Sequence, residues 1–304
     1  MTKRFTAAIR IPLAIVVYFA AMFAYLGVMV ALDSIDRVRT DYGFLALMNI
    51  GVSIVLCAAV FGVYRLLDRG NPLQLGFGIR RKDIGFLLAA LPASAAAALA
   101  FAGIASRNEA LGAEFHFDKL GDSAVVMLLV YGCVGWLIGL LQEEVLSRGY
   151  LMANLQRFGP GGAIVLSSVI FSLTHIPTKG FHGLELIIHL VSGIAYAYVY
   201  LKSGSLWVSA AVHACHNFLL DILFNNDYNV TLITFGKQMT DVDKLLQQAL
   251  LFGCVLLLTR LFYRDGSLLA PADNLRRLWQ SGKPEHLHGS TSGKQGKQGK
   301  QATA

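Results

Sequence analysis

Charged residues are scarce in this chain. Only 15% of its 304 residues are Asp, Glu, Lys or Arg, whereas 55% are hydrophobic and the mean hydropathy is +0.55. Soluble domains usually carry about 25% charged residues. The composition therefore excludes an ordinary soluble protein and predicts an integral membrane protein.

Cysteine is also rare, and its placement excludes two classes of site. The sequence contains no C-x-x-C pair, and its spacing fits neither a disulfide framework nor a cysteine zinc site. The motif H-E-x-x-H is absent too. We interpret the four cysteines as small buried hydrophobic residues, namely Cys57, Cys133, Cys215 and Cys254.

The excess of positive charge needs a partner. A formal net charge of +7 would suit a nucleic acid, but the basic residues flank apolar segments and do not line one polar helix face. We therefore expect no nucleic acid, and the lipid bilayer with its anionic headgroups as the partner of these residues.

Eight apolar segments are long enough, or nearly so, to cross a bilayer core that needs about 20 residues per helix. They predict an all-α, polytopic membrane helix bundle of about eight transmembrane helices within a membrane domain, residues 1–268. The Gly/Ser/Lys/Gln-rich remainder, 269–304, predicts a basic, disordered cytoplasmic tail. The segments are 11–32, 44–66, 84–104, 123–142 with an extension to about 156, 162–178, 184–201, 205–224 and 245–263.

The distribution of Lys and Arg predicts the orientation of these helices. With alternating sides, 19 of the 26 basic residues fall on the side of both termini and 7 on the other. The positive-inside rule then places both termini in the cytoplasm. We expect the location to be a bacterial inner membrane.

Three apolar segments carry ionisable side chains, which are costly in a membrane and usually mark function. Glu143 and His175 both lie about 13 residues from the cytoplasmic end of their segments, roughly 20 Å along a helix. His213 and Asn217 lie about 8 and 12 residues in, so three helices carry polar groups to a similar depth.

Spacing separates the two adjacent glutamates. Glu144 and Arg148 are four residues apart, which places them on one helix face as an ion pair. Glu143 points about 100° away around the helix. It is therefore left free to act as a base or as a ligand.

These groups suit the hydrolysis of an amide by water. Glu143 can take a proton from water, and His175 can position and activate the same water. His213 and Asn217 can donate hydrogen bonds to the oxyanion of a tetrahedral intermediate. This arrangement requires no cofactor.

A metal site is the alternative chemistry. Glu143, His175 and His213 could together bind a divalent metal such as zinc, which would then polarise the water. We place the metal-free arrangement first, because Asn is an uncommon zinc ligand and H-E-x-x-H is missing.

The three motifs, in order, are Glu143-Glu144-x-x-x-Arg148, Phe171-x-x-x-His175 and His213-x-x-x-Asn217. Together they resemble the CPBP family of CAAX proteases and bacteriocin-processing enzymes, with a match over about 123–224. The resemblance implies an eight-helix membrane bundle with its active site below the cytoplasmic surface.

The resemblance also implies residue roles. Glu143 and His175 would activate the water, His213 and Asn217 would stabilise the oxyanion, and Glu144 and Arg148 would support the site. The expected activity is that of an intramembrane glutamate-dependent endopeptidase. Its substrate would be a membrane-tethered or lipidated polypeptide, such as a prenylated CAAX-like protein or a leader peptide.

Two other classes remain open. Intramembrane Glu and His residues also form proton relays in proton-coupled transporters, although the paired half-repeats typical of transporters are absent from the sequence. A non-catalytic membrane scaffold or immunity protein is the second alternative. The sequence assigns no oligomeric state.

Overall fold

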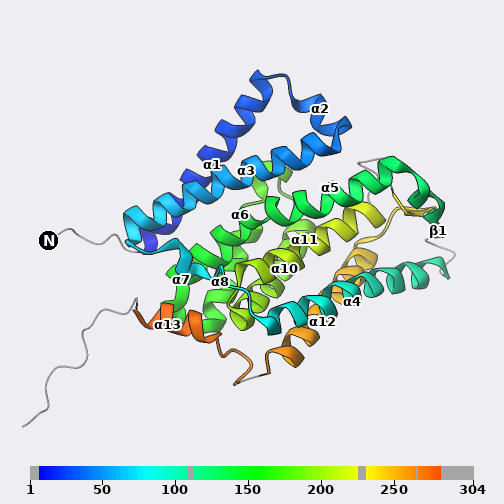
Figure 1. Ribbon diagram of the computed structural model, residues 1–304. Coiled ribbons are helices and arrows are strands. Elements are labelled where there is room, and N and C mark those ends of the chain that lie inside the picture. The colour runs from blue at the N-terminus through cyan, green and yellow to red at the C-terminus, as the bar shows by residue number, and fades with distance from the viewer. Residues whose placement is uncertain (1–6, 108–111, 225–230, 265, 282–304) are drawn as a thin grey trace, which may run out of the picture.

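Helices make up most of the described part of the chain. The computed structural model describes residues 7–107, 112–224, 231–264 and 266–281, and the predicted all-α membrane bundle is confirmed (Figure 1). The longer helices are α1 (Ala7–Ala31), α3 (Tyr42–Val63), α4 (Arg81–Ser106), α5 (Ser123–Gly139), α8 (Gly159–Leu173), α10 (Gly183–Ser203), α11 (Leu206–Leu223) and α12 (Asp241–Phe262). The shorter ones are α2 (Ile35–Thr40), α6 (Leu141–Glu144), α7 (Met152–Leu155), α9 (Ile176–Lys179) and α13 (Asp273–Ser281).

The predicted number of eight membrane spans is not confirmed. Within the described residues, six helical stretches are long and apolar enough to cross a membrane. One of them, Val125–Thr178, contains both the predicted fourth and fifth spans, and α11 is not among the six. The chain is an integral membrane protein with at least six helical stretches of membrane-spanning length among its described residues.

Helix α10 lies at the centre of the bundle. It packs against α8, α11 and α12, and every residue from Tyr196 to Ser203 is buried. The small side chains of α10 permit this close packing, as at Gly193, where an added Cβ would lie 3.0 Å from the Cβ of Ser168 on α8. The outer helices α1 and α3 diverge from each other towards α2, as Figure 1 shows.

The predicted fourth span does not continue as one regular helix. It turns at Leu140 between α5 and α6, and then forms a π-helical segment, η4 (Val145–Leu151). All seven residues of η4 are buried. Single π-helical turns occur often at functional sites, because the wider turn changes where the side chains point.

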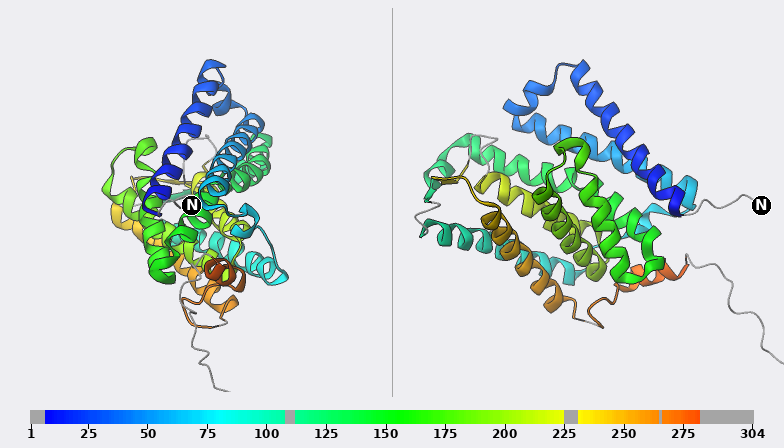
Figure 2. Two further views of the ribbon diagram at one scale, coloured as in Figure 1. Left: turned by 90° about the vertical axis from the view of Figure 1, so that its left-hand side faces the viewer. Right: turned by 180° about the vertical axis from the view of Figure 1, so that it is seen from behind.

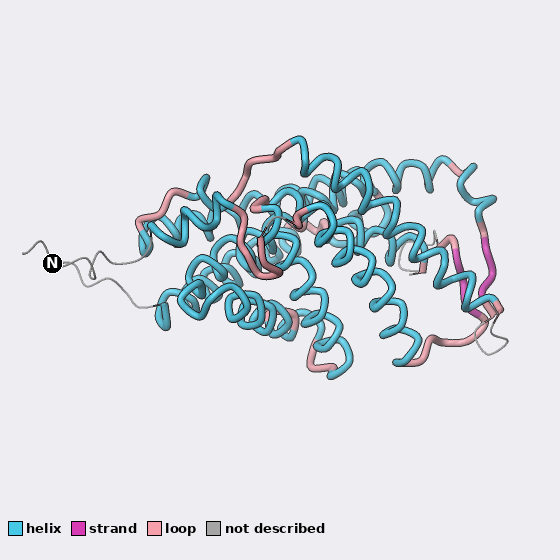
Figure 3. Tube along the Cα trace, turned by 90° about the horizontal axis from the view of Figure 1, so that it is seen from below, coloured by secondary structure: helices cyan, strands magenta, loops and turns pink. Residues whose placement is uncertain are grey.

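The start of α1, at Ala7, and helix α13 lie at the same end of the bundle (Figures 1 and 2). The opposite end carries a two-stranded antiparallel sheet of β1 (Ala113–Phe115) and β2 (Ile233–Phe235), drawn in magenta in Figure 3. In β1 and β2, Glu114 pairs with Thr234.

One part of the expected disordered tail is ordered. Residues 273–281 form the amphipathic helix α13, and its Leu275 and Trp279 are buried in the hydrophobic core. The composition of this region does not predict the helix, because the apolar pattern of α13 is only nine residues long. Residues 282–304 of the predicted tail lie outside the described residues.

Candidate active site

The centre of the candidate site is the carboxylate of Glu144, which is fully buried. Arg148 Nη1 lies 3.1 Å from its Oε1, so the ion pair predicted from the spacing is present. Two groups from α11 complete its surroundings. Ser209 Oγ donates to Oε2 at 2.5 Å, and His213 Nδ1 lies 2.9 Å from Oε1.

Arg148 is itself enclosed by protein. Its side chain is 1% exposed, and Nη2 donates to the carbonyl of Gly193 at 3.3 Å. The guanidinium lies over two aromatic rings, 4.3 Å from the ring centre of Phe171 and 5.2 Å from that of Tyr196. Such cation–π contacts help to offset the cost of burying the charge.

Glu143 and His175 face each other beside this ion pair. His175 Nε2 lies 4.0 Å from Glu143 Oε2, and their side chains are 18% and 24% exposed. Among the described residues, buried Oε2 of Glu143 has no hydrogen-bond partner. The distance is too long for a hydrogen bond, but one water molecule about 2.8 Å from each atom would span it.

The backbone fixes how His175 presents its ring. His175 caps the start of α9, directly after α8 ends, and its Nδ1 lies 2.8 Å from the carbonyl oxygen of Phe171. A carbonyl oxygen only accepts, so Nδ1 must carry the proton. Nε2, the nitrogen facing Glu143, is then the acceptor of the neutral ring.

His213 is held between a carboxylate and an aromatic ring. Besides its contact with Glu144, it stacks on Tyr196 with ring centres 4.3 Å apart and an interplanar angle of 24°. The hydroxyl of Tyr196 lies 2.6 Å from His216 Nδ1, and His216 Nε2 lies 2.8 Å from Oε1 of Gln248 on α12. His216, adjacent to the motif, therefore belongs to a network that supports Tyr196.

Asn217 lies one helical turn after His213 on α11 and is half-buried. Its position on α11 agrees with the predicted i,i+4 face. The structure thus brings together Glu143, Glu144, Arg148, His175 and His213, and it places Asn217 on the helix that carries His213.

Sequence reasoning missed three contributors. Ser209 and Tyr196 contact the motif residues directly, and His189 stacks on His175 with ring centres 3.9 Å apart. The signal for two of them was present, because polar residues recur along α10 at helical spacing. These residues are Glu185, His189, Ser192 and Tyr196.

The described residues contain no group of three or more His, Cys, Asp or Glu side chains placed to hold a metal ion. Glu143, His175 and His213 do not form such a group here. Nδ1 of His213 contacts Glu144, so Nε2 is the nitrogen of that ring that would meet a metal or a substrate.

The fold and this cluster define a class: an all-α polytopic membrane protein with a hydrolase-like set of acidic, imidazole and hydroxyl groups inside its bundle. Residues 124–219 match the family model described as Type II CAAX prenyl endopeptidase Rce1-like. This match confirms the resemblance drawn from the motifs, and at the family level it supports a CAAX-type protease. No curated protein and no solved structure matches the chain.

Proposed function

We propose that this protein is an intramembrane endopeptidase that hydrolyses a peptide bond with a water molecule activated by Glu143. The observation that carries the proposal is the facing pair of Glu143 Oε2 and His175 Nε2, 4.0 Å apart. This gap suits one water molecule, and both atoms are hydrogen-bond acceptors towards it.

The pair would work as a general base and a positioning group. As the water oxygen bonds to the substrate carbonyl carbon, Glu143 accepts the proton. The same proton then passes to the leaving nitrogen when the carbon–nitrogen bond breaks. His175, held by the Phe171 carbonyl, orients the water throughout.

His213 and Asn217 would stabilise the oxyanion. Because Nδ1 of His213 lies against Glu144, the ring is oriented with Nε2 directed elsewhere. A carboxylate only accepts, so the Glu144 contact needs a proton on Nδ1, and donation from Nε2 to the oxyanion needs a second proton there. Glu144 therefore serves His213 as well as Arg148.

The substrate class follows from the position of the site within a membrane bundle. We infer a membrane-tethered or lipidated polypeptide, with a prenylated CAAX-like protein and a leader peptide as the two candidates. The family match at 124–219 favours the first.

Glu143→Gln and His175→Ala are the direct tests. We expect each to lower the cleavage rate of membrane-anchored peptides by about 10²–10⁴-fold, the usual contribution of a general base. Glu114→Gln is the matched control, because Glu114 lies on β1 at the other end of the bundle. Purified protein in lipid, with cleavage products identified by mass spectrometry, supplies the measurement.

The outcome separates three classes of function. Cleavage by the wild type that both site variants lose supports the protease. Proton-coupled flux into liposomes without cleavage would indicate a transporter, and peptide binding without turnover would indicate a scaffold or immunity protein.

Metal dependence needs its own experiment. We expect activity to survive exhaustive chelation, because Glu143 and His175 suffice to hold the water. Loss of activity on chelation, with recovery on adding zinc, would replace this arrangement with the metal site of Glu143, His175 and His213.

A further inference from the structure

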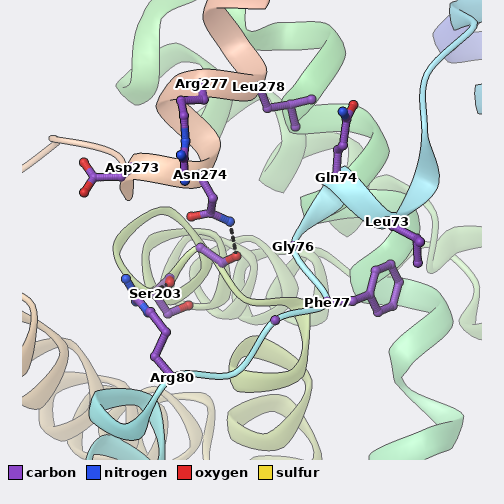
Figure 4. Close-up of a pocket in the computed structure, with 12 residues that line it drawn as sticks. Leu73, Gln74, Gly76, Phe77, Arg80, Ser203, Asp273, Asn274, Arg277 and Leu278 are labelled. Atoms are coloured by element: carbon purple, nitrogen blue, oxygen red, sulfur yellow. Dashed lines mark hydrogen bonds between the residues drawn. The ribbon is translucent and has the colours of Figure 1, made fainter.

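A cavity of 710 Å³ lies away from the candidate active site, between α13 and the segment that precedes α4 (Figure 4). Its lining comes from residues 73–80, from the turn between α10 and α11, and from α13. The candidate membrane span Gly183–Ser203 ends beside it, and the span Arg81–Ser106 begins beside it. The cavity therefore lies where hydrocarbon gives way to headgroups.

The polar part of the cavity carries two guanidinium groups. In Figure 4, Arg80 and Arg277 lie on opposite sides of it. Asp273 also lines the cavity, its carboxylate turns away from Arg277 in this view, and its charge acts on Arg80. Asp273 forms its ion pair with Arg276, 3.7 Å away, and Arg276 does not line the cavity.

Arg80 is already fixed in position. Its Nε and Nη2 donate to Asp83 at 3.2 and 3.0 Å, and Nη2 also donates to the carbonyl of Ser203 at 2.5 Å. Hydrogen bonding to Asp83 raises the pKa of Arg80, so the group stays cationic. Within the described part of the chain, Nη1 makes no hydrogen bond, which leaves two N–H donors for a ligand.

The other part of the cavity is apolar. It is lined by Leu73, Phe77 and Leu278. The side chain of Leu73 is 74% exposed on the surface of the bundle. A leucine exposed at the end of a membrane bundle is available for contact with lipid chains. The cavity thus combines a cationic part with an apolar part.

The walls of the cavity are held together by specific bonds. Asn274 Nδ2 donates to the Gly204 carbonyl at 2.7 Å, and the Ala272 N–H donates to the Leu201 carbonyl at 2.8 Å. Gly204 has a φ of +69°, and a Cβ there would overlap Asn274. Helix α13 is therefore docked on the α10–α11 turn and forms a defined wall.

We propose that this cavity binds one anionic phospholipid, with the phosphate between Arg80 and Arg277 and an acyl chain along Leu73 and Phe77. Arginine suits phosphate because its fork of N–H donors matches two phosphate oxygens. The apolar part and the position at the ends of two spans favour a lipid over free phosphate. This inference does not depend on the proposed protease activity.

The test compares two exposed arginines, one that lines the cavity and one that does not. The full-length protein in detergent is titrated with phosphatidylglycerol, and bound lipid is counted by native mass spectrometry. We expect Arg277→Ala to bind it about tenfold more weakly, the loss of one charge-assisted contact. Arg264→Ala removes the same charge from an exposed position outside the cavity lining and should bind as the wild type does.

Two further probes identify the ligand, and thermal unfolding of both variants checks that each is folded. Phosphatidylcholine with the same chains should bind more weakly than phosphatidylglycerol, and inorganic phosphate should not displace the lipid. Equal losses in the two variants, equal binding of the two lipids, or no phosphatidylglycerol bound by the wild type would overturn the proposal. Displacement by inorganic phosphate would assign the site to free phosphate instead.

Discussion

Glu144 is fully buried, yet three polar groups surround its carboxylate: Arg148, Ser209 and His213. A buried charge without partners would cost several kcal/mol, and Arg148 contacts Oε1, whereas Ser209 contacts Oε2. The two contacts from α11 therefore join the first motif to the third. Through them, Glu144 acts as the structural centre of the candidate site.

The sequence predicted only the local part of this cluster. Glu144 and Arg148 are four residues apart on one helical segment, so their contact depends on helix geometry alone. The contact of His213 with Glu144 spans α6 and α11, and it depends on how the helices pack. Depth in the membrane indicated that the motifs would meet, but not which nitrogen would face which oxygen.

Arg148→Ala tests the structural role of the pair. The variant leaves the Glu144 carboxylate buried without its cation, which should lower the free energy of unfolding by about 3–5 kcal/mol. Folded yield and thermal unfolding in detergent measure the loss. Adding Glu144→Gln removes the uncompensated charge and should recover part of the yield. An unchanged single variant would mean that the pair contributes nothing to folding.

Tyr196 tests how His213 is positioned. Tyr196→Phe keeps the ring stacked on His213 and removes only the hydroxyl that contacts His216, whereas Tyr196→Leu removes the stacking. We expect kcat to fall far more in the leucine variant, with little change of KM in either. Similar kcat values for the two variants would show that stacking does not orient the imidazole.

At the scale of elements, most predicted spans coincide with helices to within a few residues. The predicted 44–66 corresponds to α3, and 184–201 to α10. The extended fourth span departs from regular α-helix because η4 is a π-helix. An apolar run specifies that a segment is buried, but it does not distinguish i→i+4 from i→i+5 hydrogen bonding.

Helix α13 yields the prediction for this scale. Leu275 is fully buried in the core cluster, so Leu275→Ala should lower the free energy of unfolding by about 2–5 kcal/mol. Gln280→Ala is the control, because Gln280 is exposed on the same helix. Thermal unfolding in detergent compares the two. Equal stability of both variants would mean that α13 does not belong to the folded core.

At the scale of the whole molecule, the bundle has two chemically different ends. One holds α13 and the described start of α1, and the other holds β1 and β2 (Figure 1). The excess of Lys and Arg falls on the α13 end, and the positive-inside rule predicts that this end faces the cytoplasm. Both proposed sites depend on this orientation, because lipid headgroups and tethered substrates differ between the two surfaces.

Single cysteines at the two ends test the orientation. Exposed Glu114 on β1 and exposed Ser267 before α13 are each changed to cysteine in a parent whose four native cysteines are alanine. A membrane-impermeant maleimide should label Glu114→Cys in intact cells and Ser267→Cys only after lysis. The parent should take no label, and its thermal unfolding checks that the replacements preserve the fold. The reverse pattern would invert the bundle, and labelling of both positions in intact cells would mean that the two ends do not lie on opposite sides of the membrane.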